Sequence, residues 1–311
     1  MQAEPVLHLL VNRTRRRHSV GWVTAAAVVL LAGCSDAPAS PPPSLPSVDI
    51  SGYSDVSAEL RWDESRFVFP LDRYMMTDAD LDRIDRAFNA QVEQCVEEKG
   101  YDFWHSDVPP SEYLIPVDRR YGIWDLAAAS ADGYELPARF LSLREKMDDE
   151  AEKAYANRSE AQDRAEIECL RSVEQLPVIQ RGVLPDVGDD RSLYLPAELD
   201  GQAYFLALED PRAKDAFAAW AACLEDNGLT RGEGPEQLGP ADIPDELEAQ
   251  IRVAVIDVTC KRETRFIERL SSLEAQYQAA LIDQNQAALD ASVQKQAEIL
   301  RRADEIIATH G

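Results

Sequence analysis

The last 66 residues before the C-terminal glycine contain no helix-breaking residue. From Asp245 to His310 the sequence has neither glycine nor proline, the two residues least compatible with a helix interior. Apolar residues recur there at helical spacing: Ile251, Val255, Val258, Leu270, Leu273, Tyr277 and Leu281, then Ala288, Val293, Ala297 and Leu300. This stripe weakens near Arg262 and again after Leu289. We therefore expect one long helix or a helical hairpin, with its last part extending beyond the core.

One short phrase occurs twice upstream of this segment. Residues 94–101 read QCVEEKGY and residues 222–229 read ACLEDNGL, so a glycine follows each cysteine by five positions. Each phrase ends an apolar periodic segment, which begins with an N-cap candidate at Thr77 or Asp210. The spacing predicts two equivalent helices, each stopped by its glycine.

The other two cysteines also occupy similar surroundings. Before Cys169 and before Cys260 an acidic residue stands three positions earlier and an apolar residue two earlier, and an arginine follows two positions later. We interpret this as a degenerate duplication of a cysteine-bearing helix pair. The predicted fold is therefore mainly α, with two disulfide-linked helical repeats and a long C-terminal helix.

Four cysteines allow three disulfide pairings. The repeat favours Cys95–Cys169 and Cys223–Cys260, because antiparallel packing of the two helices in each half can bring their cysteines together. A four-cysteine zinc site is the alternative, but the sequence has no Cys-x-x-Cys pair. Acidic residues follow both Cys95 and Cys223, which disfavours a reactive thiol at either position.

The first 34 residues contain a basic segment, an apolar run and a cysteine, in that order. Four arginines, Arg13, Arg15, Arg16 and Arg17, precede the apolar run VGWVTAAAVVLL at residues 20–31, which is too short to span a bilayer. Leu31-Ala32-Gly33-Cys34 resembles a lipobox, which implies a diacylglycerol on Cys34 and cleavage before it. The alternative is an ordinary signal peptide with a chance cysteine. Residues 1–33 are the predicted signal peptide, and residues 34–47, rich in proline, are the predicted disordered tether.

The charge of the exported chain restricts its partners. Residues 1–33 hold four arginines and one glutamate, so 28 basic and 56 acidic residues remain, a net charge of −28. Such a charge disfavours binding to nucleic acid and to anionic lipid. The membrane is therefore expected as a partner only through the lipid on Cys34, on the outer face of the cytoplasmic membrane.

Three segments follow the tether. Residues 48–177 form the predicted first helical half with an aromatic loop insert, residues 178–209 a connector, and residues 210–311 the second half. Within the insert, segment 101–136 offers a candidate ligand site, comprising Trp104, Arg119, Arg120, Tyr121 and Trp124. The favoured alternative is that these aromatic residues cover the helical core.

Few residues are available for chemistry. Only His105 and His310 remain after export, and residues 78–85 (DADLDRID) lack the glycine and closing glutamate of an EF-hand loop. No phosphate-binding glycine loop is present. We expect no catalytic residues, no cofactor and no metal site.

Several stretches, including FPLDRYMMTDADLDRIDRAFNAQVEQCVEEKGYDF and RRYGIWDLAAASADGYE, resemble a broad group of secreted actinobacterial lipoproteins over most of residues 67–290. The resemblance implies a surface-anchored helical protein, supports the cysteine pattern and supplies no catalytic residues. We expect a non-enzymatic binding or scaffolding protein that presents its long C-terminal helix to a protein partner. A ligand-binding module using residues 101–136 is the second hypothesis, and a cell-wall hydrolase the weakest.

Overall fold

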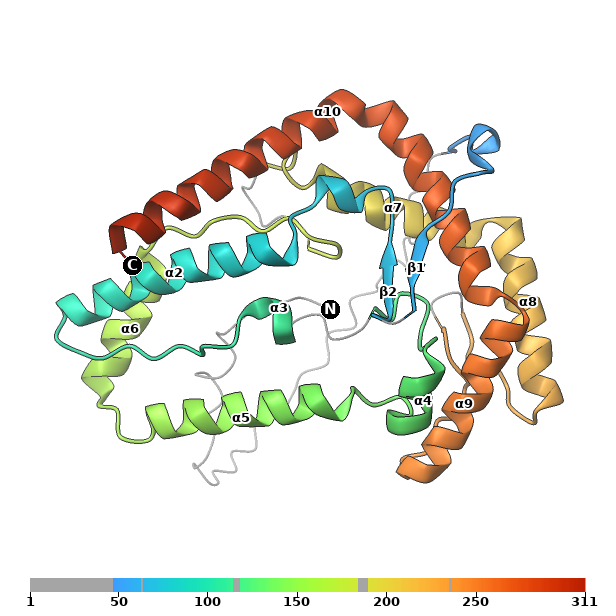
Figure 1. Ribbon diagram of the computed structural model, residues 1–311, viewed down its shortest axis with the longest axis horizontal. Coiled ribbons are helices and arrows are strands. Elements are labelled where there is room, and N and C mark those ends of the chain that lie inside the picture. The colour runs from blue at the N-terminus through green and yellow to red at the C-terminus, as the bar shows by residue number, and fades with distance from the viewer. Residues whose placement is uncertain (1–46, 63, 114–117, 184–189, 235–236, 311) are drawn as a thin grey trace, which may run out of the picture. The chain divides into compact units, whose positions relative to one another are not determined.

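The computed structural model describes residues 47–310 apart from 63, 114–117, 184–189 and 235–236 (Figure 1). Its strands are β1 (Glu59–Arg61) and β2 (Arg66–Val68), and a 3-10 helix η3 (Asp72–Tyr74) follows them. The α-helices are α2 (Asp78–Glu98), α3 (Pro110–Tyr113), α4 (Leu126–Asp132), α5 (Ala138–Tyr155), α6 (Glu160–Ser172), α7 (Leu195–Glu209), α8 (Pro211–Asp226), α9 (Leu247–Glu263) and α10 (Phe266–His310). The prediction of a mainly helical fold with a long C-terminal helix is confirmed.

Helix α10 packs against more of the described elements than any other helix does. Its first half packs against α7 and α8, where Leu270, Leu273, Tyr277 and Leu281 are buried as their spacing predicts. Its second half packs along α2, and Ala303 and Ile306 are buried with Ala87 (Figure 1). The expectation that the last part of the helix extends beyond the core is therefore wrong.

The buried face of α10 beyond Leu289 also differs from the predicted stripe. Val293 and Ala297 are exposed, whereas Ser292 and Gln296 are buried. The Ser292 hydroxyl donates to the Leu193 carbonyl (2.8 Å), and Gln296 Nε2 donates to the Tyr74 carbonyl (2.7 Å). Because these polar side chains satisfy backbone carbonyls inside the protein, apolar spacing alone selects the wrong face.

The segment without glycine or proline is two helices rather than one. Between α9 and α10, Arg265 adopts a left-handed conformation with φ of +53°. The Thr264 amide and hydroxyl both bond to the Cys260 carbonyl, which closes the last turn of α9. The side chains of the next two residues, Phe266 and Ile267, are almost completely buried in the core. We infer that burial of these two side chains offsets the roughly 1–2 kcal/mol that a left-handed residue costs.

The repeated phrase forms the same C-terminal cap in both halves. Gly100 and Gly228 have φ of +85° and +77°. The amide after each glycine donates five residues back: Tyr101 to Val96 at 3.2 Å and Leu229 to Leu224 at 2.9 Å. This is the Schellman motif, in which glycine takes the left-handed position without a steric penalty. The glycines are thus explained as helix stops.

Each helix pair is joined by its predicted cysteines. Cys95 on α2 lies at disulfide distance from Cys169 on α6, with Cα atoms 5.8 Å apart. Cys223 on α8 pairs in the same way with Cys260 on α9, with Cα atoms 5.6 Å apart. Both predicted pairs are therefore at disulfide distance, and their cysteines are 74 and 37 positions apart in the sequence.

The predicted connector contains a central helix. Residues 195–209 form α7, which is apolar on nearly all sides and packs extensively on α10. Pro196 stands at the start of the helix, where a proline is tolerated. Burial of a helix that is apolar all round outweighs the ~1 kcal/mol cost of Gly201. The described residues from 47 onward belong to one compact unit, and α7 is a core element within it.

Candidate functional site

The predicted ligand-binding residues do not form a common surface. The Trp104 ring contacts Tyr155 edge-on, and Arg119 donates to the carbonyls of Tyr134 and Glu135. Tyr121 is 0% and Trp124 2% exposed. The candidate ligand site of Trp104, Arg119, Arg120, Tyr121 and Trp124 is therefore not supported, and the alternative that the aromatic residues cover the core fits the structure.

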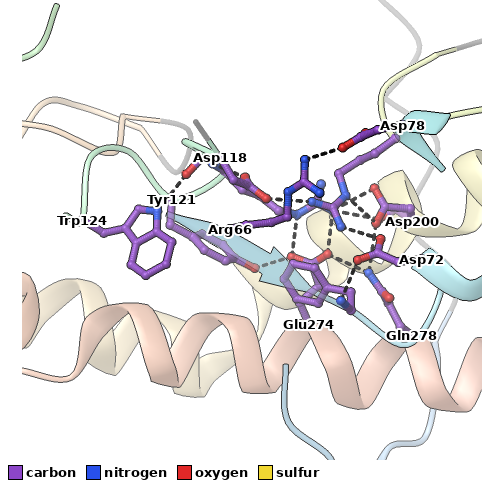
Figure 2. Close-up of polar contacts among 12 residues, drawn as sticks. Arg66, Asp72, Asp78, Asp118, Tyr121, Trp124, Asp200, Glu274 and Gln278 are labelled. Carbon is purple, nitrogen blue, oxygen red and sulfur yellow. Dashed lines mark hydrogen bonds and ion pairs between the residues drawn. The ribbon is translucent and has the colours of Figure 1, made fainter. Parts of the chain in front are cut away.

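Arg120 instead forms the centre of a buried charge network, and Figure 2 shows the acids of that network, Asp72, Asp118, Asp200 and Glu274. Its Nε and Nη2 donate to the two carboxylate oxygens of Glu274 at 2.8 and 2.6 Å. Nη2 also lies 3.0 Å from an oxygen of Asp200. The Arg120 side chain is 10% exposed and that of Glu274 0%. The loop at residue 120, α7 and α10 are thus joined through one guanidinium group.

Uncharged groups complete the environment of the two buried acids. The Tyr121 hydroxyl donates to Glu274. Gln278 Nε2 donates to Asp200 at 3.0 Å and to Glu274 at 2.9 Å, while its Oε1 accepts from the Leu71 amide at 2.9 Å. Residue 71 follows β2, so the network also fixes the N-terminal strand segment to α10.

A second arginine extends the network toward the surface. Arg181 contacts Asp72 at 2.6 Å and Asp118 at 3.0 Å, and its Nε lies 3.5 Å from Asp200. Its guanidinium group and that of Arg120 both lie over the Phe69 ring, at 5.0 and 5.5 Å from the centroid. At the edge, Arg66 pairs with Asp78 at 2.9 Å.

The network holds more acids than bases. Two arginines, Arg120 and Arg181, face four carboxylates on Asp72, Asp118, Asp200 and Glu274. Burial raises the pKa of Asp200 and of Glu274, and the attraction of Arg120 opposes that rise. Burial lowers the pKa of Arg120, but Glu274 and Asp200 outweigh it and raise that pKa well above its ordinary value. Arg120 therefore stays cationic, and its role is to hold its own loop, α7 and α10 together.

A second buried charge lies between α8 and α9. Lys261 is 0% exposed and donates to the carbonyls of Leu238 (2.7 Å) and Ile123 (3.0 Å) and to Asp257 (3.2 Å). Asp257 also accepts from Trp220 Nε1 at 2.9 Å and the Tyr134 hydroxyl at 3.0 Å. All three ammonium protons have acceptors, so this lysine fastens two loops to α9.

Sequence reasoning missed both buried clusters except for Arg120 and Tyr121. The only local signal is the charged pair Asp257 and Lys261, which are four positions apart in a helix with apolar residues at Ala254 and Val258. Asp200 and Glu274 look like ordinary exposed acids in a chain this acidic.

Within the described ranges, no group of three or more His, Cys, Asp or Glu residues is arranged to hold a metal ion. His105 contacts the neighbouring Ser106 carbonyl through Nδ1 at 3.2 Å. No helix in the described part of the chain is long and apolar enough to cross a membrane. Cys34, the proposed signal peptide and all but the last residue of the tether lie outside the described residues.

No family model matches the chain, and neither the curated proteins nor the solved structures include one with significant similarity to it.

Proposed function

We propose that this chain is a lipid-anchored protein of the outer face of the cytoplasmic membrane, whose helical body binds another macromolecule and catalyses no reaction. The observation that carries the proposal is the presence of two cysteine pairs at disulfide distance within one helical body. Disulfides persist in oxidising compartments outside the cytoplasm. The Leu31-Ala32-Gly33-Cys34 sequence supplies the matching export and anchoring signal.

The buried charges support a binding body over a reaction centre. Arg120, Glu274 and Lys261 are enclosed, and each has partners from distant parts of the chain. Groups placed in this way hold segments in fixed positions, whereas a reacting group must reach its substrate. The resemblance to secreted actinobacterial lipoproteins agrees with this interpretation.

We do not propose helix α10 as the surface that binds a protein partner, although the sequence suggests it. Because Leu270, Leu273 and Leu281 are buried against other helices, the apolar stripe of α10 lends no support to docking of a protein along that helix. The membrane remains a proposed partner through the diacylglycerol on Cys34.

Fatty-acid labelling of Cys34→Ala tests the anchor. Cells grown with an alkyne-tagged palmitate should label the wild-type protein in the membrane fraction. The Cys34→Ala variant should remain unlabelled and be either unprocessed or released to the medium, while Ser35→Ala serves as the matched control. Membrane retention of a processed, unlabelled Cys34→Ala protein would refute the proposal. Crosslinking in live cells then identifies the bound partner.

A further inference from the structure

Within the described part of the chain, helix α5 is held at its two ends and contributes no buried residue to the core. Just before its first residue, Arg119 donates to the carbonyls of Tyr134 and Glu135. At its end, Tyr155 contacts the Trp104 ring and donates to Glu166 at 3.2 Å. None of the 18 residues of α5 is buried, and its most extensive contact with another described element is with the short helix α3 (Figure 1).

The helix nevertheless has one apolar side. Its apolar stripe consists of Phe140, Leu143, Met147, Ala151 and Ala154, at steps of 3, 4, 4 and 3. All five are only half-buried, and the positions between them are charged or exposed. A helix with such a stripe normally buries it against a neighbour. The protein therefore leaves part of this face uncovered along four turns.

The charges of α5 are divided between its halves. Residues 138–146 contain three basic residues and one acidic residue, a net charge of +2, and residues 147–155 contain one basic and four acidic residues, a net charge of −3. This order opposes the helix macrodipole, which favours acids near the start and bases near the end. The arrangement therefore weakens the isolated helix but suits an antiparallel neighbour with the same charge order.

We propose that α5 is a homodimerisation surface, which pairs antiparallel with α5 of a second copy of this chain about a twofold axis at Met147. In this register Phe140 meets Ala154 of the other copy and Leu143 meets Ala151, so each large side chain faces a small one. A single face that is complementary to itself is the requirement for a twofold interface.

The flanking charges agree with this register. Arg144 and Asp148 lie on one flank of the stripe, and Lys146 and Glu150 on the other; the latter two are 3.7 Å apart within the helix. In an antiparallel pair each flank faces the same flank of the other copy. Arg144 then lies opposite Asp148 of the second copy, and Lys146 opposite its Glu150, so every pair is attractive.

One helix pair of this length forms a small interface, so association in solution is weak. Crosslinking of the purified full chain in detergent therefore tests the proposal. Met147→Cys should form a disulfide-linked dimer on mild oxidation, because the axis brings the two sulfurs together. Leu141→Cys is the matched control, since Leu141 is 46% exposed and lies off the stripe. Equal dimer yields from the two variants would overturn the proposal.

A charge exchange adds a second, independent readout. In the Met147→Cys background, Arg144→Glu should lower the crosslinking rate roughly tenfold by replacing two attractive pairs with repulsive ones. Adding Asp148→Arg should restore it. The thermal unfolding midpoint should barely change, because no side chain of α5 is buried. Failure of the exchange to restore crosslinking would refute the register. None of these outcomes depends on the lipid anchor.

Discussion

Arg120 and Glu274, 154 positions apart in the chain, form a two-pronged ion pair inside the protein, with N–O distances of 2.8 and 2.6 Å. The pair joins the loop before α4 to the long helix α10. The Glu274 side chain has no exposed surface, so its carboxylate is stabilised by Arg120, Tyr121 and Gln278 and not by water. Arg120 supplies the only positive charge among these three partners.

Replacement of Arg120 by methionine should lower the free energy of unfolding by about 3–5 kcal/mol, because it leaves the Glu274 carboxylate buried without its counter-ion. The matched control is Arg302→Met. Arg302 also pairs with a glutamate, Glu174 at 2.6 Å, but both side chains are nearly half exposed, so the expected loss is below about 1 kcal/mol. Urea unfolding at neutral pH measures both variants. Equal losses would contradict the assignment of the buried pair as a structural clamp.

A second prediction concerns Asp85 on α2. Burial raises the pKa of this carboxyl, His105 opposes the rise and Asp82 adds to it. In the unfolded chain an aspartate has a pKa of about 3.9. Because the folded pKa is the higher one, the folded state binds the proton more tightly, and the free energy of unfolding gains a contribution as pH falls through the folded pKa. That gain is complete below about pH 3.9.

Asp85→Asn should remove this contribution. Relative to wild type, the variant should therefore lose stability as the pH is lowered from 7 toward 4, since only the wild type gains a proton at this position. Denaturant titrations at several pH values provide the measurement, with the exposed Asp149→Asn as control. A variant whose pH dependence parallels that of the wild type would show that Asp85 titrates alike in both states.

Sequence patterns predict the local features of this fold well. The N-cap at Thr77 is confirmed, with its hydroxyl accepting from the Asp80 amide, and so are the glycine stops and the cysteine pairs. These features depend on residues within one turn, or on a repeat that is visible in the sequence.

The features that escaped prediction depend on contacts between distant segments. Gln296 is buried because the Tyr74 carbonyl needs a donor, and Arg265 is left-handed because two apolar residues after it enter the core. Lys261 is buried because carbonyls from two separate loops meet it. In each case the cause is a contact with a distant segment, and for Gln296 and Lys261 polarity alone predicts a surface position.

Removal of either cysteine pair should destabilise the protein by about 4 kcal/mol in the chain-entropy model, because the closed loops span 74 and 37 positions. The two double variants are Cys95→Ala with Cys169→Ala, and Cys223→Ala with Cys260→Ala. Thermal unfolding of each measures the loss. Alkylation followed by mass spectrometry checks the premise: modification of any of these four thiols without prior reduction would contradict it.

Gly122 offers a test of the Lys261 cluster that leaves every charge in place. Its φ is +75°, and a Cβ atom there would lie 2.3 Å from the Leu238 carbonyl oxygen and 2.8 Å from Lys261 Nζ. Gly182 is the matched control, because its φ is +78° but a Cβ atom would meet nothing within 4 Å. Alanine at either position incurs the cost of a left-handed residue, roughly 1–2 kcal/mol.

Gly122→Ala must in addition displace the Leu238 carbonyl or the Lys261 ammonium group, and so break a buried hydrogen bond at a further cost of about 1–3 kcal/mol. We therefore expect Gly122→Ala to be the more destabilising of the two by that difference, measured by denaturant unfolding. If the two variants lose the same stability, the loop at Leu238 adapts freely and Lys261 does not hold it in place. A larger loss for Gly122→Ala that disappears in a Lys261→Met background would assign the effect to the lysine itself.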